Sequence, residues 1–288
     1  MDNKKRTAIQ LVATLIQNAN YKGFFTGKIS EAPIKSVCVP GLNCYSCPGA
    51  IGACPIGSLQ SSLSGLHIRI PYYVVGLLIF FGVILGRLVC GFLCPFGFLQ
   101  DLIYMIPIFK KHRVRTFKGD GILRYLKYFI LVICVLLIPS LVRFTPFFCK
   151  YICPSGTVSG ILLALADHKI LSALGGQFIW KASVLGIILV TSIFIARPFC
   201  RYICPLGAFY GLFNKISIVR LKINEETCTH CGACARCCPM AVDPLKNPDS
   251  AECIRCGKCV SECNGSLHLG FVKGDKKKKK KKKDQLLY

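Results

Sequence analysis

Two runs of cysteine decide how the end of this chain folds: CTHCGACARCCP at residues 228–239 and CIRCGKCVSEC at residues 253–263. In each run, three cysteines are separated by two residues each, and a fourth follows after three more residues. Three thiolates at this spacing can wrap one face of a cubane iron–sulfur cluster, while the fourth reaches a neighbouring cluster. Zinc sites instead pair two Cys-x2-Cys units across a longer loop. The double run therefore predicts two [4Fe–4S] clusters rather than zinc.

The two runs are predicted to exchange their last ligands, as in two-cluster bacterial ferredoxins. One cluster would take Cys228, Cys231, Cys234 and Cys263. The other would take Cys253, Cys256, Cys259 and Cys238. Residues 220–272 contain little apolar material, so the clusters are expected to hold this part together. We predict a small α+β, ferredoxin-like domain there.

Upstream of this domain the composition is that of a membrane protein. The chain has 288 residues, of which 53% are hydrophobic, with 20 cysteines and a formal charge of +24. The apolar residues fall in blocks, and three blocks are close to the ~20 residues that cross a bilayer. They cover residues 70–89, 122–142 and 178–196. Such long apolar runs exclude a small, secreted disulfide scaffold.

An earlier apolar stretch, residues 7–25, is ambiguous. Five polar residues interrupt it: Gln10, Gln17, Asn18, Asn20 and Lys22. It is either a first, tilted span or an amphipathic helix in the membrane interface. We favour a span, which predicts a mainly α-helical protein with about four transmembrane helices in residues 1–219.

Lys and Arg are unevenly divided among the connecting segments, and positively charged segments normally stay in the cytoplasm. Residues 110–118 and the region after residue 196 are rich in Lys and Arg, whereas the loops at 30–67 and 144–177 are poorer. We therefore predict a multi-pass protein of the cell (inner) membrane. Its C-terminal domain would be cytoplasmic and the two poorer loops would face outside.

Eight consecutive lysines, residues 276–283, lie in the final segment, residues 273–288. A run of like charges repels itself, so this tail is predicted to be disordered. It either adheres to an anionic cytoplasmic leaflet or is simply solvated. Nucleic-acid binding is not expected, because no basic face is interleaved with aromatic residues.

A shorter motif, Cys-Pro-x-Gly, is repeated in the membrane part. Its four copies begin at Cys54, Cys94, Cys153 and Cys204. In three copies another cysteine stands four residues earlier: Cys90, Cys149 and Cys200. Proline suits the first turn of a helix, so each copy is predicted to begin a helix whose positive end faces the cysteines. That position suits an anionic, thiolate-bound cluster.

The predicted topology brings two of these copies to the cytoplasmic ends of spans. Their cysteines, which could together bind one iron–sulfur centre, are Cys90, Cys94, Cys200 and Cys204. On the outer side, Cys149 and Cys153 could bind a further centre with cysteines of the 30–67 loop. The candidates there are Cys44, Cys47 and Cys54. Disulfides or zinc are the alternatives for the outer cysteines.

The sequence resembles the membrane polyferredoxins of the NapH and NosR type. The resemblance rests on CGFLCPFGFLQD at residues 90–101, CRYICPLG at residues 200–207 and the C-terminal double cysteine run. It implies four membrane helices with both ends in the cytoplasm. It also implies electron movement between a quinol pool or cytoplasmic carrier and a redox partner on the outer side. This chain differs in having the third Cys-x3-Cys-Pro motif and a cysteine-rich outer loop, and in lacking a large outer flavin domain.

We predict a membrane-bound electron-transfer protein that connects a cytoplasmic carrier or quinol pool with a redox partner at or across the membrane. Its partners would be membrane lipid and a ferredoxin, flavoprotein or reductase subunit, with a quinone as a further candidate. No nucleophile, general base or substrate pocket is visible, so any turnover would be redox turnover at clusters or a bound quinone. The alternatives are an assembly or maturation factor for a metalloenzyme and an iron–sulfur redox sensor.

Overall fold

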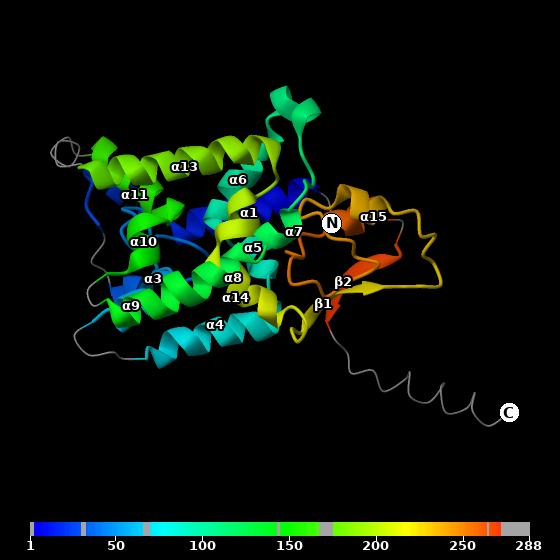
Figure 1. Ribbon diagram of the computed structural model, residues 1–288, viewed down its shortest axis with the longest axis horizontal. Coiled ribbons are helices and arrows are strands. Elements are labelled where there is room, and N and C mark those ends of the chain that lie inside the picture. The colour runs from blue at the N-terminus through cyan, green and yellow to red at the C-terminus, as the bar shows by residue number, and fades with distance from the viewer. Residues whose placement is uncertain are drawn as a thin grey trace.

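The computed structural model describes residues 3–29, 33–65, 70–142, 145–166, 175–263 and 265–271. Within these residues the chain forms a helical bundle, to which a small unit with a two-stranded sheet is attached at one end (Figure 1). The lysine tail predicted at residues 273–288 lies outside the described residues.

Among the residues that the structure describes, two helices are long and apolar enough to cross a membrane. One extends from Asp120 to Leu141. It comprises α7 (Asp120–Leu123), α8 (Leu126–Phe129), the π-helix η3 (Ile130–Leu137) and α9 (Ile138–Leu141). The other is α13 (Gly176–Phe194). Both coincide closely with spans predicted from the sequence.

The remaining predicted span, residues 70–89, forms a shorter helix than expected. Helix α4 covers Tyr72–Leu85 and ends at Gly86, whose φ of 56° is a value that glycine adopts readily. Packing also requires glycine here, because a Cβ would lie 2.6 Å from Oδ1 of Asn214. The chain then turns into a separate short helix, α5 (Leu88–Phe92).

The ambiguous N-terminal stretch forms two helices, α1 (Asn3–Gln17) and α2 (Tyr21–Thr26). On α1 the side chain of Gln10 is buried, whereas Val12 and Ile16 are 54% and 60% exposed. Polar residues that face the protein and apolar residues that face outward suit a helix at the edge of a membrane bundle. Two of the polar residues that made the sequence pattern ambiguous, Gln10 and Gln17, are therefore interior contacts, whereas Lys22 is exposed.

The two loops predicted to face outside contain further helices. The first holds η1 (Pro33–Ser36) and α3 (Pro55–Leu63), and the second holds α10 (Phe147–Tyr151) and α11 (Pro154–Ala166). Helix α11 is apolar and packs against α13. Helices α3 and α11 follow Cys-Pro motifs, as those motifs predict, whereas η1 and α10 were not predicted from the sequence.

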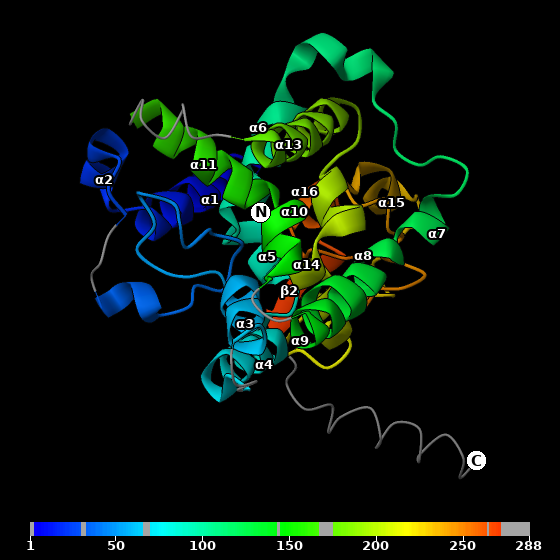
Figure 2. The same cartoon turned by 60° about the vertical axis from the view of Figure 1, so that its left-hand side comes forward.

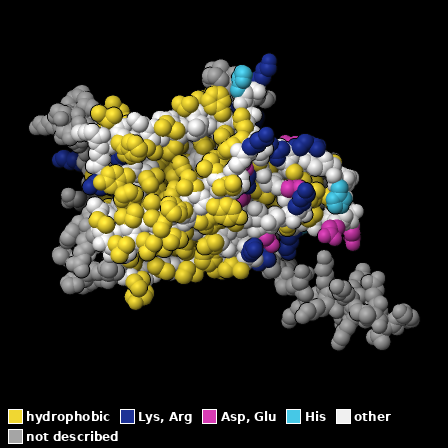
Figure 3. All heavy atoms as spheres, in the orientation of Figure 1, with side chains coloured by type: hydrophobic (Ala, Val, Ile, Leu, Met, Phe, Trp, Pro, Cys, Tyr) yellow, Lys and Arg dark blue, Asp and Glu magenta, His cyan; other side chains and the backbone are white. Residues whose placement is uncertain are grey.

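The outside of the bundle is apolar. Ile122 on α7 is 80% exposed and Ile179 on α13 is 69% exposed. Figure 3 shows a broad hydrophobic face over the bundle, with many Lys and Arg side chains where the C-terminal part joins it. Soluble proteins rarely expose a continuous apolar surface of this extent, so the surface indicates association with lipid.

The C-terminal unit, residues 219–271, contains β1 (Val219–Ile223) and β2 (Leu267–Phe271), which pair antiparallel with Val219 opposite Phe271. Between the strands lie α15 (Ala233–Cys237) and α16 (Lys258–Glu262). The glycines that precede these two helices have φ values of 70° and 74°. The two cysteine runs therefore make the same kind of turn, as their matching spacing suggests.

Short helices that carry or follow the Cys-x3-Cys-Pro motifs lie at the centre of the bundle. Figure 2 shows α5, α10 and α14 (Pro205–Phe213) surrounded by α13, α4 and the Asp120–Leu141 helix, which contains α8. Helix α14 packs against both α4 and α8. The repeated cysteines are thus placed in the interior of the bundle.

Candidate iron–sulfur centres

Each of the four Cys-Pro motifs begins a helix, which confirms the prediction from the motif. The prolines are the first residues of α3, α6 (Pro95–Met105), α11 and α14. The sulfurs of Cys94 and Cys204 accept hydrogen bonds from the backbone N–H of the motif glycine, at 3.4 and 3.3 Å. Cys54 and Cys153 interact with their motif glycines in the same way. Each motif therefore aims a helix N-terminus at its sulfur, which favours the thiolate.

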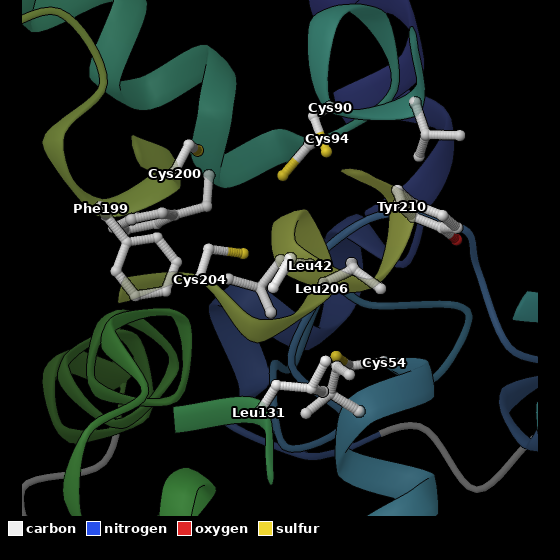
Figure 4. Packing of buried hydrophobic residues seen from close by; sticks show 14 of the residues in the cluster. Leu42, Cys54, Cys90, Cys94, Leu131, Phe199, Cys200, Cys204, Leu206 and Tyr210 are labelled. Carbon is white, nitrogen blue, oxygen red and sulfur yellow. The ribbon is translucent and has the colours of Figure 1, made fainter. Parts of the chain in front are cut away.

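Four of the predicted site residues come together at the centre of the bundle: Cys90, Cys94, Cys200 and Cys204. Cys90 lies on α5 and Cys200 on the π-helix η4 (Phe199–Ile203). All four are buried, and in every pair a negative charge on one sulfur would raise the pKa of the other. Figure 4 shows the four sulfurs turned toward a shared space. We call these four residues the inner group.

The chemistry of the inner group fits an iron–sulfur cluster, because four cysteine thiolates are the ligand set of [4Fe–4S]. Burial raises the pKa of all four thiols, to about 11 for Cys200. Iron would displace these protons on binding. Among the described residues, no three Cys, His, Asp or Glu side chains stand close enough to hold one metal ion. A [4Fe–4S] cluster does not need four sulfurs around one ion, because each thiolate binds a different iron atom of the cluster.

Two buried arginines lie against the inner group in a reciprocal arrangement. Arg87, three residues before Cys90, donates a hydrogen bond to the carbonyl oxygen of Cys200 at 2.9 Å. Arg197, three residues before Cys200, donates to the carbonyl oxygen of Cys90 at 2.5 Å. Their exposed fractions are 0% and 1%. A thiolate-bound cluster carries net negative charge, so these two guanidinium groups would offset it.

Asp101, on α6, holds Arg197 in place. Its carboxylate accepts a hydrogen bond from Arg197 Nε at 2.7 Å and from Gln10 at 3.1 Å, and it pairs with Arg6 at 3.2 Å. Burial alone would raise the pKa of this carboxyl group. The charges of Arg197 and Arg6 and the hydrogen bonds outweigh burial and lower the pKa, so Asp101 is ionised.

Gln100 connects the two halves of the inner group. Its Nε2 donates to the sulfur of Cys200 at 3.3 Å, and its Oε1 accepts from the backbone N–H of Phe199 at 3.1 Å. From the sequence, Gln100 and Asp101 were included only as part of the segment that resembles the family, and neither arginine was predicted as a site residue. The signal that could have identified the arginines is their shared spacing, Arg-x2-Cys-x3-Cys-Pro.

In the C-terminal unit, the structure brings together the four cysteines predicted for one of the two clusters. These are Cys238, Cys253, Cys256 and Cys259, and in every pair a negative charge on one sulfur would raise the pKa of the other. In the other predicted set, Cys234 interacts with Cys263, and Cys228 and Cys231 precede Cys234 in the same cysteine run. All twenty cysteines lie within the described residues, and each is a free thiol.

The C-terminal unit contacts the bundle closely beside the inner group. A Cβ at Gly91, the residue after Cys90, would lie 2.5 Å from the carbonyl oxygen of Ile254, the residue after Cys253. Asn214 donates hydrogen bonds to the carbonyl oxygens of Ser250 and Cys253, both at 2.8 Å. The backbone of one cysteine run therefore touches the backbone of the inner group.

Glu252 strengthens the same contact. It pairs with Arg87 at 3.2 Å and with Lys127 at 2.5 Å. Burial alone would raise the pKa of the Glu252 carboxyl group, but the neighbouring cations outweigh burial and lower it. Arg87 therefore joins the inner group to the C-terminal unit through one side chain.

A second set of four cysteines lines a cavity of about 490 Å³. We call them the outer group: Cys44, Cys54, Cys149 and Cys153. In every pair a negative charge on one sulfur would raise the pKa of the other. Cys47, also predicted as an outer ligand, does not line this cavity, and its sulfur lies 3.8 Å from Oδ1 of Asn18.

Comparisons with known proteins agree with these observations. Three segments match a family model described as a 4Fe-4S binding domain: residues 70–115, 128–171 and 178–224. Each segment contains one Cys-x3-Cys-Pro motif. No solved structure is significantly similar to the chain.

Three relatives illustrate the similarity. The uncharacterized protein MJ0749 of Methanocaldococcus jannaschii is 32% identical over 228 residues, 77% of this chain and 80% of that protein. The putative electron transport protein YccM of Escherichia coli is 27% identical over 241 residues, 78% of this chain and 64% of that protein. The ferredoxin-type protein NapH of Haemophilus influenzae is 26% identical over 221 residues, 70% of this chain and 69% of that protein.

The repeated cysteine motifs and these matches define a ferredoxin-type iron–sulfur protein of electron transport. More narrowly, the chain belongs to the NapH-type polyferredoxin family, as the resemblance in its sequence indicated.

Proposed function

We propose that this protein is a multi-pass membrane electron carrier. In this proposal the C-terminal unit is a cytoplasmic two-cluster ferredoxin, and the inner group holds a further [4Fe–4S] cluster within the bundle. The observation that carries the proposal is the backbone contact between Gly91 and Ile254, because it joins two sets of cysteines. Clusters held this close together can exchange electrons without a mobile carrier.

Four helices cross the membrane in this proposal: α1, α4, the Asp120–Leu141 helix and α13. The apolar outer surface of the bundle supports it (Figure 3). Figure 1 places the N-terminus and the C-terminal unit at the same end of the bundle. The positively charged connecting segments favour the cytoplasm for that end.

A [4Fe–4S] cluster, when bound, supplies a one-electron redox couple. The chain itself determines how readily the cluster accepts an electron. Arg87 and Arg197 offset negative charge, Gln100 donates a hydrogen bond to a ligand sulfur, and burial excludes water. These are the features by which proteins tune cluster potentials.

A cytoplasmic redox protein is the proposed partner of the C-terminal unit. Cys231 is exposed, whereas Cys256 is buried on the side of the inner group. The cluster that contains Cys231 is therefore the proposed contact point for a ferredoxin, flavoprotein or reductase subunit. The membrane-embedded clusters would exchange electrons with a quinone or with a partner farther across the membrane.

Removing one inner ligand should remove one cluster. We expect Cys94→Ala to lose about four irons and four sulfides per chain, together with one EPR signal outside the ferredoxin pair. Full-length protein would be purified anaerobically, with iron, sulfide and reduced EPR spectra measured. Cys134→Ala, which removes another buried thiol of the bundle, is the control and should keep all the iron. A parent with only about eight irons, unchanged in Cys94→Ala, would refute the membrane cluster.

A further inference from the structure

The outer group repeats the construction of the inner group. The segments CPIGSLQ at residues 54–60 and CPFGFLQ at residues 94–100 share five of their seven residues. In both, the glutamine is 0% exposed. Gln100 accepts a hydrogen bond from the backbone N–H of Phe199 at 3.1 Å, and Gln60 accepts one from that of Cys149 at 3.2 Å. The same side chain therefore connects the two halves of each group.

A positive charge also recurs beside the outer group. Lys181, on α13, donates a hydrogen bond to the carbonyl oxygen of Cys149 at 3.4 Å, as Arg197 does to that of Cys90. Lys35 is 2% exposed and lines the same cavity. A buried cation such as Lys35 needs a negative partner, and thiolates bound to a cluster would supply one.

The fourth sulfur comes from an unexpected position. Ala50 stands four residues before Cys54, where the other copies of the motif have a cysteine. Cys44 fills this gap, because it lines the cavity and interacts with the other three sulfurs. A zinc site would need four sulfurs about 2.3 Å from one ion, whereas no three Cys, His, Asp or Glu side chains of the described residues stand close enough to hold one metal ion.

We propose that the outer group binds a second bundle [4Fe–4S] cluster through Cys44, Cys54, Cys149 and Cys153. Residues 41–44 connect this site to the inner group. The proposal extends the proposed function, because it adds a centre farther from the C-terminal unit than the inner group.

The connection between the two groups is short. The backbone N–H of Leu42 donates a hydrogen bond to the sulfur of Cys94, and Cys44 follows two residues later. A Cβ at Gly41 would lie 3.2 Å from Cα of Cys94, so the loop runs directly against the inner group. Figure 4 shows Leu42 and Leu206 between the inner sulfurs and Cys54. Two clusters at these positions would interact magnetically.

The test counts iron and sulfide in full-length protein purified anaerobically. We expect about sixteen irons in the parent, and about four fewer in Cys44→Ala and in Cys153→Ala. Cys47→Ala, a change in the same loop, is the matched control and should keep all the iron. The EPR signal of the inner cluster, broadened by its neighbour in the fully reduced parent, should narrow in Cys44→Ala.

Each other outcome has a definite meaning. A parent with about twelve irons, or zinc in place of four irons, overturns the outer cluster whatever the variants do. Equal iron loss in Cys47→Ala overturns the ligand set, and a disulfide among the outer cysteines of the isolated protein overturns the site. Cys94→Ala, measured in parallel, separates the two proposals. Iron loss in Cys94→Ala alone leaves the proposed function intact, whereas no loss in either variant refutes both.

Discussion

Replacing Gly91 with leucine should separate the C-terminal unit from the inner group while leaving iron in both. A Cβ at this position would lie 2.5 Å from the carbonyl oxygen of Ile254. That oxygen cannot move away easily, because Ile254 lies between the predicted ligands Cys253 and Cys256. Overpacking of this kind costs about 1–3 kcal/mol, and moving the unit outward relieves it. We expect slower electron exchange between the C-terminal clusters and the inner cluster.

The measurement is rapid reduction of the C-terminal clusters by a soluble donor, with freeze-quenched EPR following the inner-cluster signal. Gly186→Leu is the matched control, because Gly186 also lies on a bundle helix and a Cβ there would have no neighbouring atom within 4 Å. Gly211→Leu should act like Gly91→Leu, since a Cβ there would lie 2.9 Å from the carbonyl oxygen of Ala251. If Gly91→Leu and Gly211→Leu kept the parental iron content and the parental rate of electron transfer to the inner cluster, a direct contact between the two sets of clusters would be contradicted.

The sequence predicted features that depend on neighbouring residues. A proline after each motif cysteine begins a helix because its missing N–H is not needed in the first turn. Apolar runs of sufficient length predicted the Asp120–Leu141 and Gly176–Phe194 helices to within two residues at each end. The spacing within the two C-terminal runs also predicted one set of cysteines that lies together, Cys238, Cys253, Cys256 and Cys259, although ligation itself stays a prediction.

Features that depend on packing between distant segments were harder to predict from the sequence. Helix α11 is too short to be recognised as a span, and only its packing against α13 shows that it belongs to the bundle. The choice of Cys44 over Cys47 is similar, because the two cysteines are separated by only two residues and the fold decides which one enters the cavity. The spacing of apolar residues did not predict the buried face of α1. The face of this helix that packs against the protein is polar, as the buried Gln10 illustrates.

Replacing Arg197 with leucine should both destabilise the bundle and lower the potential of the inner cluster. The substitution removes the closest partner of the buried Asp101, and breaking such a buried pair costs about 3–5 kcal/mol. It also removes a positive charge that is hydrogen-bonded to the carbonyl oxygen of Cys90. Adding an electron then becomes less favourable, and we expect the potential to fall by about 50–100 mV.

The double variant Arg197→Leu/Asp101→Leu distinguishes charge compensation from a purely structural role. Replacing both members of a buried pair with apolar residues is often close to neutral. Thermal stability should therefore recover in part, short of the parent because Arg6 also loses Asp101 as its partner. The potential should stay below that of the parent, because the guanidinium contacts the inner group directly, whereas the carboxylate is linked to it only through Arg197 and Gln10. Redox titration followed by EPR gives the potential, and loss of cluster absorbance on heating gives the stability. If the potential returned together with the stability, Arg197 would be a packing residue and its charge would not set the inner-cluster potential.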